Sequence, residues 1–187
     1  MKNHAKLNIP NLISLSRLLS VPLAVWLIIN DGLLICFWVL IYAGASDAVD
    51  GFIAKRYDLR SKLGGYLDPI ADKALLISVF ISLGYSGYLY SWLILIVVFR
   101  DILILLGALI YHLMYQDLVI EPLVISKINT TVQFILLAVI IGFNGFNLEE
   151  SFFIDVLIYI TAFTTLSSGA AYVYTWGGKV ARKELGE

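Results

Sequence analysis

The chain carries little charge for its length. Of its 187 residues only 14% are charged, whereas 60% are hydrophobic and the mean hydropathy is +0.87. A soluble domain has about 25% charged and about 45–50% apolar residues. The composition therefore excludes an ordinary soluble domain and indicates an integral membrane protein. The net charge of −1 argues neither for nor against nucleic acid, and no nucleic acid partner is expected.

Cysteine and histidine are scarce. Cys36 is the one cysteine, so no internal disulfide can form, and its place in an apolar run indicates a packing role. His4 and His112 are isolated and have no constellation of metal ligands around them. The first six residues lead into an apolar run with no small-residue cleavage site and without the Arg and Ser richness of a transit peptide. We expect an uncleaved first membrane span.

Long apolar runs predict an all-α, polytopic membrane protein. About 20 apolar residues are needed to cross the hydrocarbon core as a helix. Turn signals at Asn30-Asp31-Gly32 and at residues 84–88 separate neighbouring runs. The sequence therefore predicts six transmembrane helices in a single domain, residues 1–187. Their approximate ranges are 9–29, 33–50, 63–83, 90–112, 128–144 and 152–176.

The distribution of basic residues predicts the orientation. With both termini in the cytoplasm, every lysine and arginine except Arg100 lies in an inner segment or at the inner end of a helix. The outer loops then carry Asp31 and the Glu149-Glu150 pair but no base. Outer and inner aromatic belts are expected at Tyr85, Tyr88, Tyr90 and Trp92, and at Tyr172, Tyr174 and Trp176.

Four of the fourteen carboxylates fall into two pairs at the inner ends of the second and third predicted helices. Residues three and four apart share a helix face, so each pair joins small residues in one stripe. The short basic connection at residues 55–62 would turn the chain back and set the stripes facing each other. The first stripe contains Asp47, Asp50, Gly51 and Ala54, and the second contains Gly64, Asp68 and Asp72.

Four converging carboxylates require a counter-ion. Oxygen ligands select a hard cation such as Mg²⁺, Ca²⁺ or Mn²⁺, and two metal ions are a known solution for displacement at phosphorus. The groove left by the small residues and the basic loop beside it suit a phosphate or pyrophosphate substrate. The alternative is that these residues are caps and loop residues with no joint role, as Asp68 before Pro69 could be.

This stretch resembles the signature of the CDP-alcohol phosphatidyltransferases, Asp-x-x-Asp-Gly-x-x-Ala-Arg, eight residues, Gly, three residues, Asp, three residues, Asp. The seven residues of the two stripes fit with the right gaps, and an amino-terminal Asn-Ile-Pro-Asn-Leu segment extends the likeness. The departure is Lys55, where the family usually has arginine; lysine keeps the charge but loses the bidentate fork. Adjacent Arg56 is placed to compensate.

The resemblance implies a metal-dependent enzyme of phospholipid biosynthesis. It would transfer the phosphatidyl group of CDP-diacylglycerol to an alcohol and release CMP, using magnesium or manganese, with two ions expected. Asp47, Asp50 and Asp68 would bind metal, while Asp72 would complete the metal site and act as the base. Gly51, Ala54, Lys55 and Gly64 would contact the CDP moiety. The family also implies a homodimer, and the expected location is a bacterial cytoplasmic membrane with the site facing the cytoplasm.

The acceptor must be read outside the signature. Arg100 and Lys127 are placed to bind an anion, although Arg100 could instead form a structural pair with Asp101, and Lys127 could extend to the headgroups. Relatives that use glycerophosphate carry further bases where this chain has Ala108 and Asn129. Residues 122–133 and 160–168 resemble eukaryotic-type cardiolipin synthases, which use phosphatidylglycerol.

Phosphatidylglycerol is therefore the expected acceptor. Glycerol 3-phosphate, as in a phosphatidylglycerophosphate synthase, is the alternative, and inositol or serine stay open. An ion-coupled transporter is a remote alternative, because intramembrane charges also mark ion pathways. It would spread its carboxylates through the membrane depth rather than gather them at one face.

Overall fold

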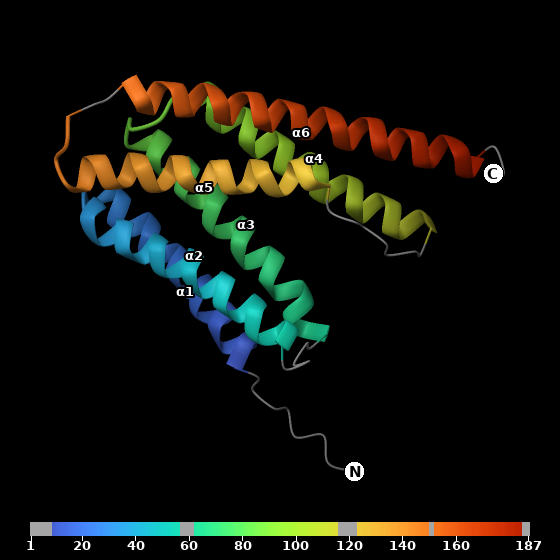
Figure 1. Cartoon of the computed structure of the whole chain (residues 1–187), viewed down its shortest axis with the longest axis horizontal. Coiled ribbons are helices and arrows are strands. Elements are labelled where there is room, and N and C mark those ends of the chain that lie inside the picture. The colour runs from blue at the N-terminus through green and yellow to red at the C-terminus, as the bar shows by residue number, and fades with distance from the viewer. Residues whose placement is uncertain (1–8, 57–61, 116–122, 150–151, 185–187) are drawn as a thin grey trace, which may run out of the picture. The chain divides into compact units, whose positions relative to one another are not determined.

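The described chain is all-α, as the sequence predicts. The computed structural model describes the backbone of residues 9–56, 62–115, 123–149 and 152–184, and the side chains of residues 15–46, 71–107, 123–149 and 152–175. Six helices follow one another in this part of the chain (Figure 1). They are α1 (Ile9–Ile29), α2 (Leu33–Arg56), α3 (Lys62–Tyr85), α4 (Ser91–Tyr115), α5 (Val124–Gly145) and α6 (Phe152–Glu184).

Turns separate the helices where the sequence places them. Asp31 lies between α1 and α2 with a φ of 57°, and Gly87 lies between α3 and α4 with a φ of 83°. The second of these conformations costs glycine little because it has no Cβ. The Tyr88 hydroxyl donates to Asp31 Oδ1 at 3.1 Å, which ties the two turns together.

Several helices are longer than the predicted spans. α2 continues to Arg56 and α4 to Tyr115, α5 begins at Val124, before Lys127, and α6 continues beyond Trp176 to Glu184. Hydrophobicity marks only the apolar part of a helix, whereas the segment after Trp176 continues with good helix formers such as lysine, alanine and arginine. α6 therefore has 33 residues, about 50 Å at 1.5 Å per residue.

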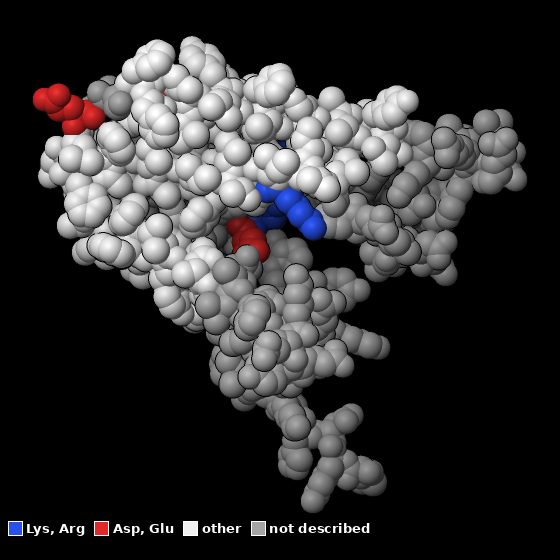
Figure 2. All heavy atoms as spheres, in the orientation of Figure 1, with Lys and Arg blue, Asp and Glu red and all other residues white. Residues whose placement is uncertain are grey.

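Two stretches of the described residues are long and apolar enough to cross a membrane. They are Val124–Gly145, which is all of α5, and Phe152–Thr175 in α6. Leu15–Ile29 and Leu33–Ser46 are shorter apolar stretches. On the face drawn in Figure 2, the described residues show few charged side chains. The six-span topology itself stays a prediction.

The chain divides into two compact units. The first comprises residues 1–88 and 138–149, and the second comprises residues 89–137 and 150–187. The prediction of one functional domain is not tested by this division. In the first unit α1 packs against both α2 and α3, and its core includes Ile28, Cys36, Leu40, Phe80 and Leu83.

The end of α5 approaches α2 closely within the first unit. A Cβ built on Gly145 would lie 2.8 Å from the backbone nitrogen of Leu34, and one on Gly142 would lie 3.1 Å from the Phe37 ring. Phe37 also meets Phe146 edge to face, with ring centroids 5.6 Å apart. In the second unit α4 packs against α6, and side-chain hydrogen bonds join both to the first half of α5.

Candidate active site

The carboxylate signature lies on two consecutive helices of the first unit. The Asp47–Lys55 part lies in the last turns of α2, and the Gly64–Asp72 part lies in the first turns of α3. Because both segments are helical, the i, i+3 and i, i+4 spacings do place each set on one helix face. Asp47, Asp50, Gly51, Ala54, Lys55, Gly64 and Asp68 lie outside the residues whose side chains the structure describes. Their convergence therefore stays a prediction.

Asp72 is the signature residue whose side chain is described, and it forms an ion pair with Arg17. Arg17 Nη1 on α1 donates to Asp72 Oδ1 on α3. The arginine side chain is 1% exposed, whereas that of the aspartate is 34% exposed. Ser20 Oγ donates to the Arg17 carbonyl at 2.6 Å, one turn further along α1. The pair joins a fully buried cation to a carboxylate that a reactant can still reach.

From the sequence alone, Arg17 counts only as one of the basic residues expected at the inner ends of the helices. A signal for its role was present, because a lone cation in an apolar membrane helix is costly unless an opposite charge meets it. The partner could not be read from spacing, since Arg17 and Asp72 are 55 positions apart. Arg17 therefore joins the candidate site as a residue that sequence reasoning missed.

A divalent metal fits the donor chemistry of the signature. Asp47, Asp50, Asp68 and Asp72 offer oxygen ligands only, the kind that Mg²⁺ and Mn²⁺ prefer. Within the described residues no group of three or more His, Cys, Asp and Glu side chains could hold a metal ion. Three of the four expected ligands lie beyond those residues, so the metal site stays a prediction.

Arg100 lies at the centre of a buried polar cluster in the second unit. Its Nη1 donates to Asp101 Oδ1 at 2.6 Å, and its Nη2 donates to Ser126 Oγ on α5 at 2.6 Å and to Ser168 Oγ on α6. The Arg100 and Asp101 residues are 3% and 1% exposed. The ion pair with Asp101 is the one that the structural alternative for Arg100 predicts. The contacts with the two serines, which also join α4 to α5 and α6, were not predicted. Arg100 Nε is buried and has no hydrogen-bond partner among the described residues.

Tyr172 belongs to the same cluster. Its ring centroid lies 6.0 Å from the Arg100 guanidinium carbon, and the residue is 4% exposed. A belt tyrosine must reach the membrane surface, so the expectation of Tyr172 in an inner aromatic belt is wrong. Tyr174, by contrast, is exposed.

The two α5 positions weighed for acceptor binding lie in different environments. Lys127 is exposed, whereas Asn129 is fully buried and its Oδ1 accepts from the hydroxyls of Thr164 and Thr165, both at 2.9 Å. Gln133 Nε2 donates to Thr165 Oγ1 at 3.4 Å. Together with Ser126 and Ser168 these residues form an α5–α6 polar seam. The side chain of Ala108 lies outside the described residues.

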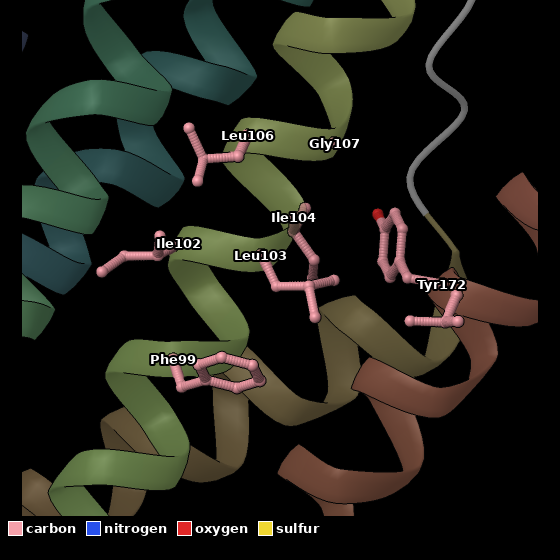
Figure 3. A pocket seen from close by; sticks show the side chains of 8 residues that line it. Phe99, Ile102, Leu103, Ile104, Leu106, Gly107 and Tyr172 are labelled. Carbon is pink, nitrogen blue, oxygen red and sulfur yellow. The ribbon is translucent and has the colours of Figure 1, made fainter.

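An apolar pocket of about 430 Å³ lies between α4 and α6 in the second unit (Figure 3). None of its described lining residues is charged, so its chemistry suits a hydrocarbon group rather than a phosphate or a sugar. Its volume is within the usual range of ligand sites, about 300–1,000 Å³. Its lining residues are Phe99, Ile102, Leu103, Ile104, Leu106, Gly107, Tyr172 and Val173.

Comparison with known proteins identifies the family. The family model for CDP-alcohol phosphatidyltransferase matches residues 7–177. The chain is 36% identical over 184 residues to a chloroplastic CDP-diacylglycerol–glycerol-3-phosphate 3-phosphatidyltransferase of Oryza sativa, covering 89% of this chain and 56% of that protein. It is 33% identical over 192 residues to the cardiolipin synthase (CMP-forming) of Homo sapiens, covering 93% and 63%.

A third relative matches over nearly its whole length. The CDP-diacylglycerol–glycerol-3-phosphate 3-phosphatidyltransferase of Blochmanniella floridana is 30% identical over 184 residues, 93% of each chain. The chain spans 56% and 63% of the rice and human relatives. The family match covers most of the chain, including the whole signature. The chain therefore belongs to the CDP-alcohol phosphatidyltransferase family.

Proposed function

We propose that the protein transfers the phosphatidyl group of CDP-diacylglycerol to an alcohol and releases CMP. The observation that carries this proposal is the complete carboxylate signature at the ends of α2 and α3 in a chain of this family. The acceptor hydroxyl oxygen forms a bond to the phosphatidyl phosphorus. The pyrophosphate bond to CMP breaks, and the hydroxyl proton passes to Asp72. A general base must lie within hydrogen-bond reach of that proton, and the Asp72 side chain, the one described among the signature carboxylates, is 34% exposed.

The other signature residues would bind the donor. Asp47, Asp50 and Asp68, together with Asp72, would hold the divalent metal, which when bound offsets negative charge on the pyrophosphate. Gly51, Ala54 and Gly64 would let the CDP moiety approach the helix backbone. Lys55 would supply a positive charge to its phosphates.

Phosphatidylglycerol is the acceptor that we favour, which would make the protein a cardiolipin synthase. Asn129 is uncharged, and its side chain is buried and accepts from two threonines. It therefore offers no positive charge to a soluble phosphate. Arg100 is likewise enclosed by Asp101 and two serines. A neutral glycerol head that is already in the bilayer needs fewer anion ligands. Lys127, which is exposed, is the positively charged residue that we assign to binding the acceptor or its phosphate.

Glycerol 3-phosphate is the second candidate acceptor. The rice and Blochmanniella relatives are named for this alcohol, and the Blochmanniella relative matches over 93% of its length. The human relative is instead named a cardiolipin synthase. The comparisons thus divide between the two acceptors.

We further propose six membrane spans with both termini and the signature on the cytoplasmic side, since the basic residues gather on that side of this arrangement. A homodimer is also proposed from the family resemblance. Cysteine accessibility on each side of sealed vesicles would test the topology. Mass measurement of the detergent-solubilised protein would test the dimer.

A transfer assay tests the function. Purified full-length protein would receive CDP-diacylglycerol and Mg²⁺, with phosphatidylglycerol, glycerol 3-phosphate, inositol or serine offered separately. We expect CMP and cardiolipin with phosphatidylglycerol. Product from glycerol 3-phosphate but not from phosphatidylglycerol would overturn the acceptor, and no CMP with any acceptor would overturn the activity.

Asp72→Asn tests the role of the base in the same assay. The variant should lose transfer while it still binds CDP-diacylglycerol. Asp155→Asn is the matched control, because Asp155 is an exposed carboxylate in the first turn of α6. This control should keep wild-type turnover.

A further inference from the structure

Arg17 is a buried cation in the first unit, and its guanidinium contacts the partly exposed carboxylate of Asp72. The arginine side chain is 1% exposed, and Nη1 donates to Asp72 Oδ1. On α3, the neighbouring Ala71, Leu75 and Leu76 are themselves buried and apolar. A guanidinium that is itself buried is retained at a cost in desolvation. A hydrophobic side chain of similar size would pack there without that cost.

The contact between Arg17 and Asp72 places the guanidinium so that it supports the carboxylate. Charge-assisted hydrogen bonds are short and directional, so a donor held rigidly by α1 limits the orientations of the carboxylate on α3. Asp72 keeps 34% of its side chain accessible, so the carboxylate is held without being enclosed. A group that must accept a proton at a defined position needs such support from a neighbour with little freedom of its own.

We infer that Arg17 is a positioning residue for proton transfer: it orients the Asp72 carboxylate toward the acceptor hydroxyl. This inference rests on the proposed function, in which Asp72 is the base. Arg17 acts through the Asp72 carboxylate, to which it donates, and is not assigned a contact with the substrate. A purely structural pair, which only fastens α1 to α3, is the competing explanation.

The two explanations differ in kinetics. If Arg17 orients the base, Arg17→Gln lowers kcat by about 100-fold, the scale expected when a reacting group is misplaced by about 1 Å. The KM for CDP-diacylglycerol stays within about twofold, because donor binding does not require the base. Arg17→Lys keeps a positive charge but offers one ammonium in place of the planar fork. Its kcat should fall between those of Arg17→Gln and the wild type.

The experiment measures kcat, KM for the donor, donor binding and thermal unfolding for the wild type, Arg17→Gln, Arg17→Lys and Asp72→Asn. Activity is normalised to protein that binds CDP-diacylglycerol, which removes any loss from misfolding. Ser20→Ala serves as the control on the same helix, since it removes a hydrogen bond to the Arg17 carbonyl but leaves the guanidinium in place. It should keep the wild-type kcat.

Wild-type kcat in folded Arg17→Gln, or a loss confined to KM, would overturn the inference. If Arg17→Gln does not fold, Arg17→Lys decides, because wild-type kcat in that variant also contradicts an orienting role. The same measurements distinguish a failure of the proposed function from a failure of the inference about Arg17. An inactive wild type refutes the transfer reaction, and an active Asp72→Asn refutes the base, whereas an inactive Asp72→Asn beside an active Arg17→Gln refutes only the role of Arg17.

Discussion

Replacing Arg100 with methionine is expected to destabilise the second unit strongly. Arg100 is 3% exposed and donates to Asp101, Ser126 and Ser168. Its removal leaves the Asp101 carboxylate, 1% exposed, without this cation. Breaking a buried ion pair from one side costs about 3–5 kcal/mol, a large part of the roughly 5–15 kcal/mol that stabilises a typical protein.

The double variant Arg100→Met/Asp101→Asn isolates the electrostatic part of that cost. With the negative charge also removed, no buried charge of the pair is left, so most of the lost stability should return. The assay is thermal or denaturant unfolding in detergent for the wild type, both single variants and the double variant. The coupling free energy of this cycle measures the interaction between the two side chains.

Two results would refute this reasoning about Arg100. One is an Arg100→Met variant as stable as the wild type, and the other is a double variant no more stable than Arg100→Met. The same proteins also test the acceptor role. A stable double variant with a raised acceptor KM would assign Arg100 to the acceptor as well, whereas an unchanged KM would leave it a structural role alone.

Two further predictions concern packing and pH. Gly145→Ala should destabilise the protein by about 1–3 kcal/mol, because the new Cβ would lie 2.8 Å from the backbone of Leu34. Gly169→Ala is the matched control, since its Cβ would lie at an ordinary contact distance of 3.6 Å from Arg100 Cγ. The melting temperatures of the two variants should shift in opposite directions or by clearly different amounts. Burial, and then the hydrogen bond to Asp31, raise the pKa of Tyr88 above its ordinary value of 10.0. The folded protein therefore favours the neutral phenol. The stability that this preference contributes is present below about pH 10 and is lost as the pH rises through the raised pKa. Melting temperatures between about pH 8 and pH 11 should therefore fall more steeply for the wild type than for Tyr88→Phe, and parallel curves would contradict the assignment.

The helices could be predicted from the sequence because hydrophobic length and turn chemistry are local properties. The turn at Asn30-Asp31-Gly32 lies between α1 and α2, and the turn that ends at Tyr88 lies between α3 and α4. The end of α6 was missed because its last turns are polar and helical at once. Apolar length defines the part of a helix that can enter a membrane, but it does not define where the helix stops.

The carboxylate signature could also be predicted as a set of positions, since helical spacing converts a sequence gap into a face. The tertiary partners could not. From the sequence, Asn129 marks a position where relatives that use glycerophosphate carry a basic residue. In the structure it lies in the α5–α6 polar seam and accepts from Thr164 and Thr165, which are about 35 positions away. Nothing in the local sequence of α5 specifies which residues of α6 will meet it.

Among the described residues, two buried arginines show how much of the site's chemistry can be predicted from the sequence. A cation in an apolar helix predicts a nearby carboxylate. For Arg100 that partner is the next residue, whereas for Arg17 it is Asp72 on another helix. This second pairing changes the charge balance expected of the signature, because the charge of Asp72 is already offset by Arg17. Arg17 holds the Asp72 carboxylate in place, so Asp72→Asn removes a positioned group that the proposed reaction uses both as base and as one metal ligand, and transfer should be lost.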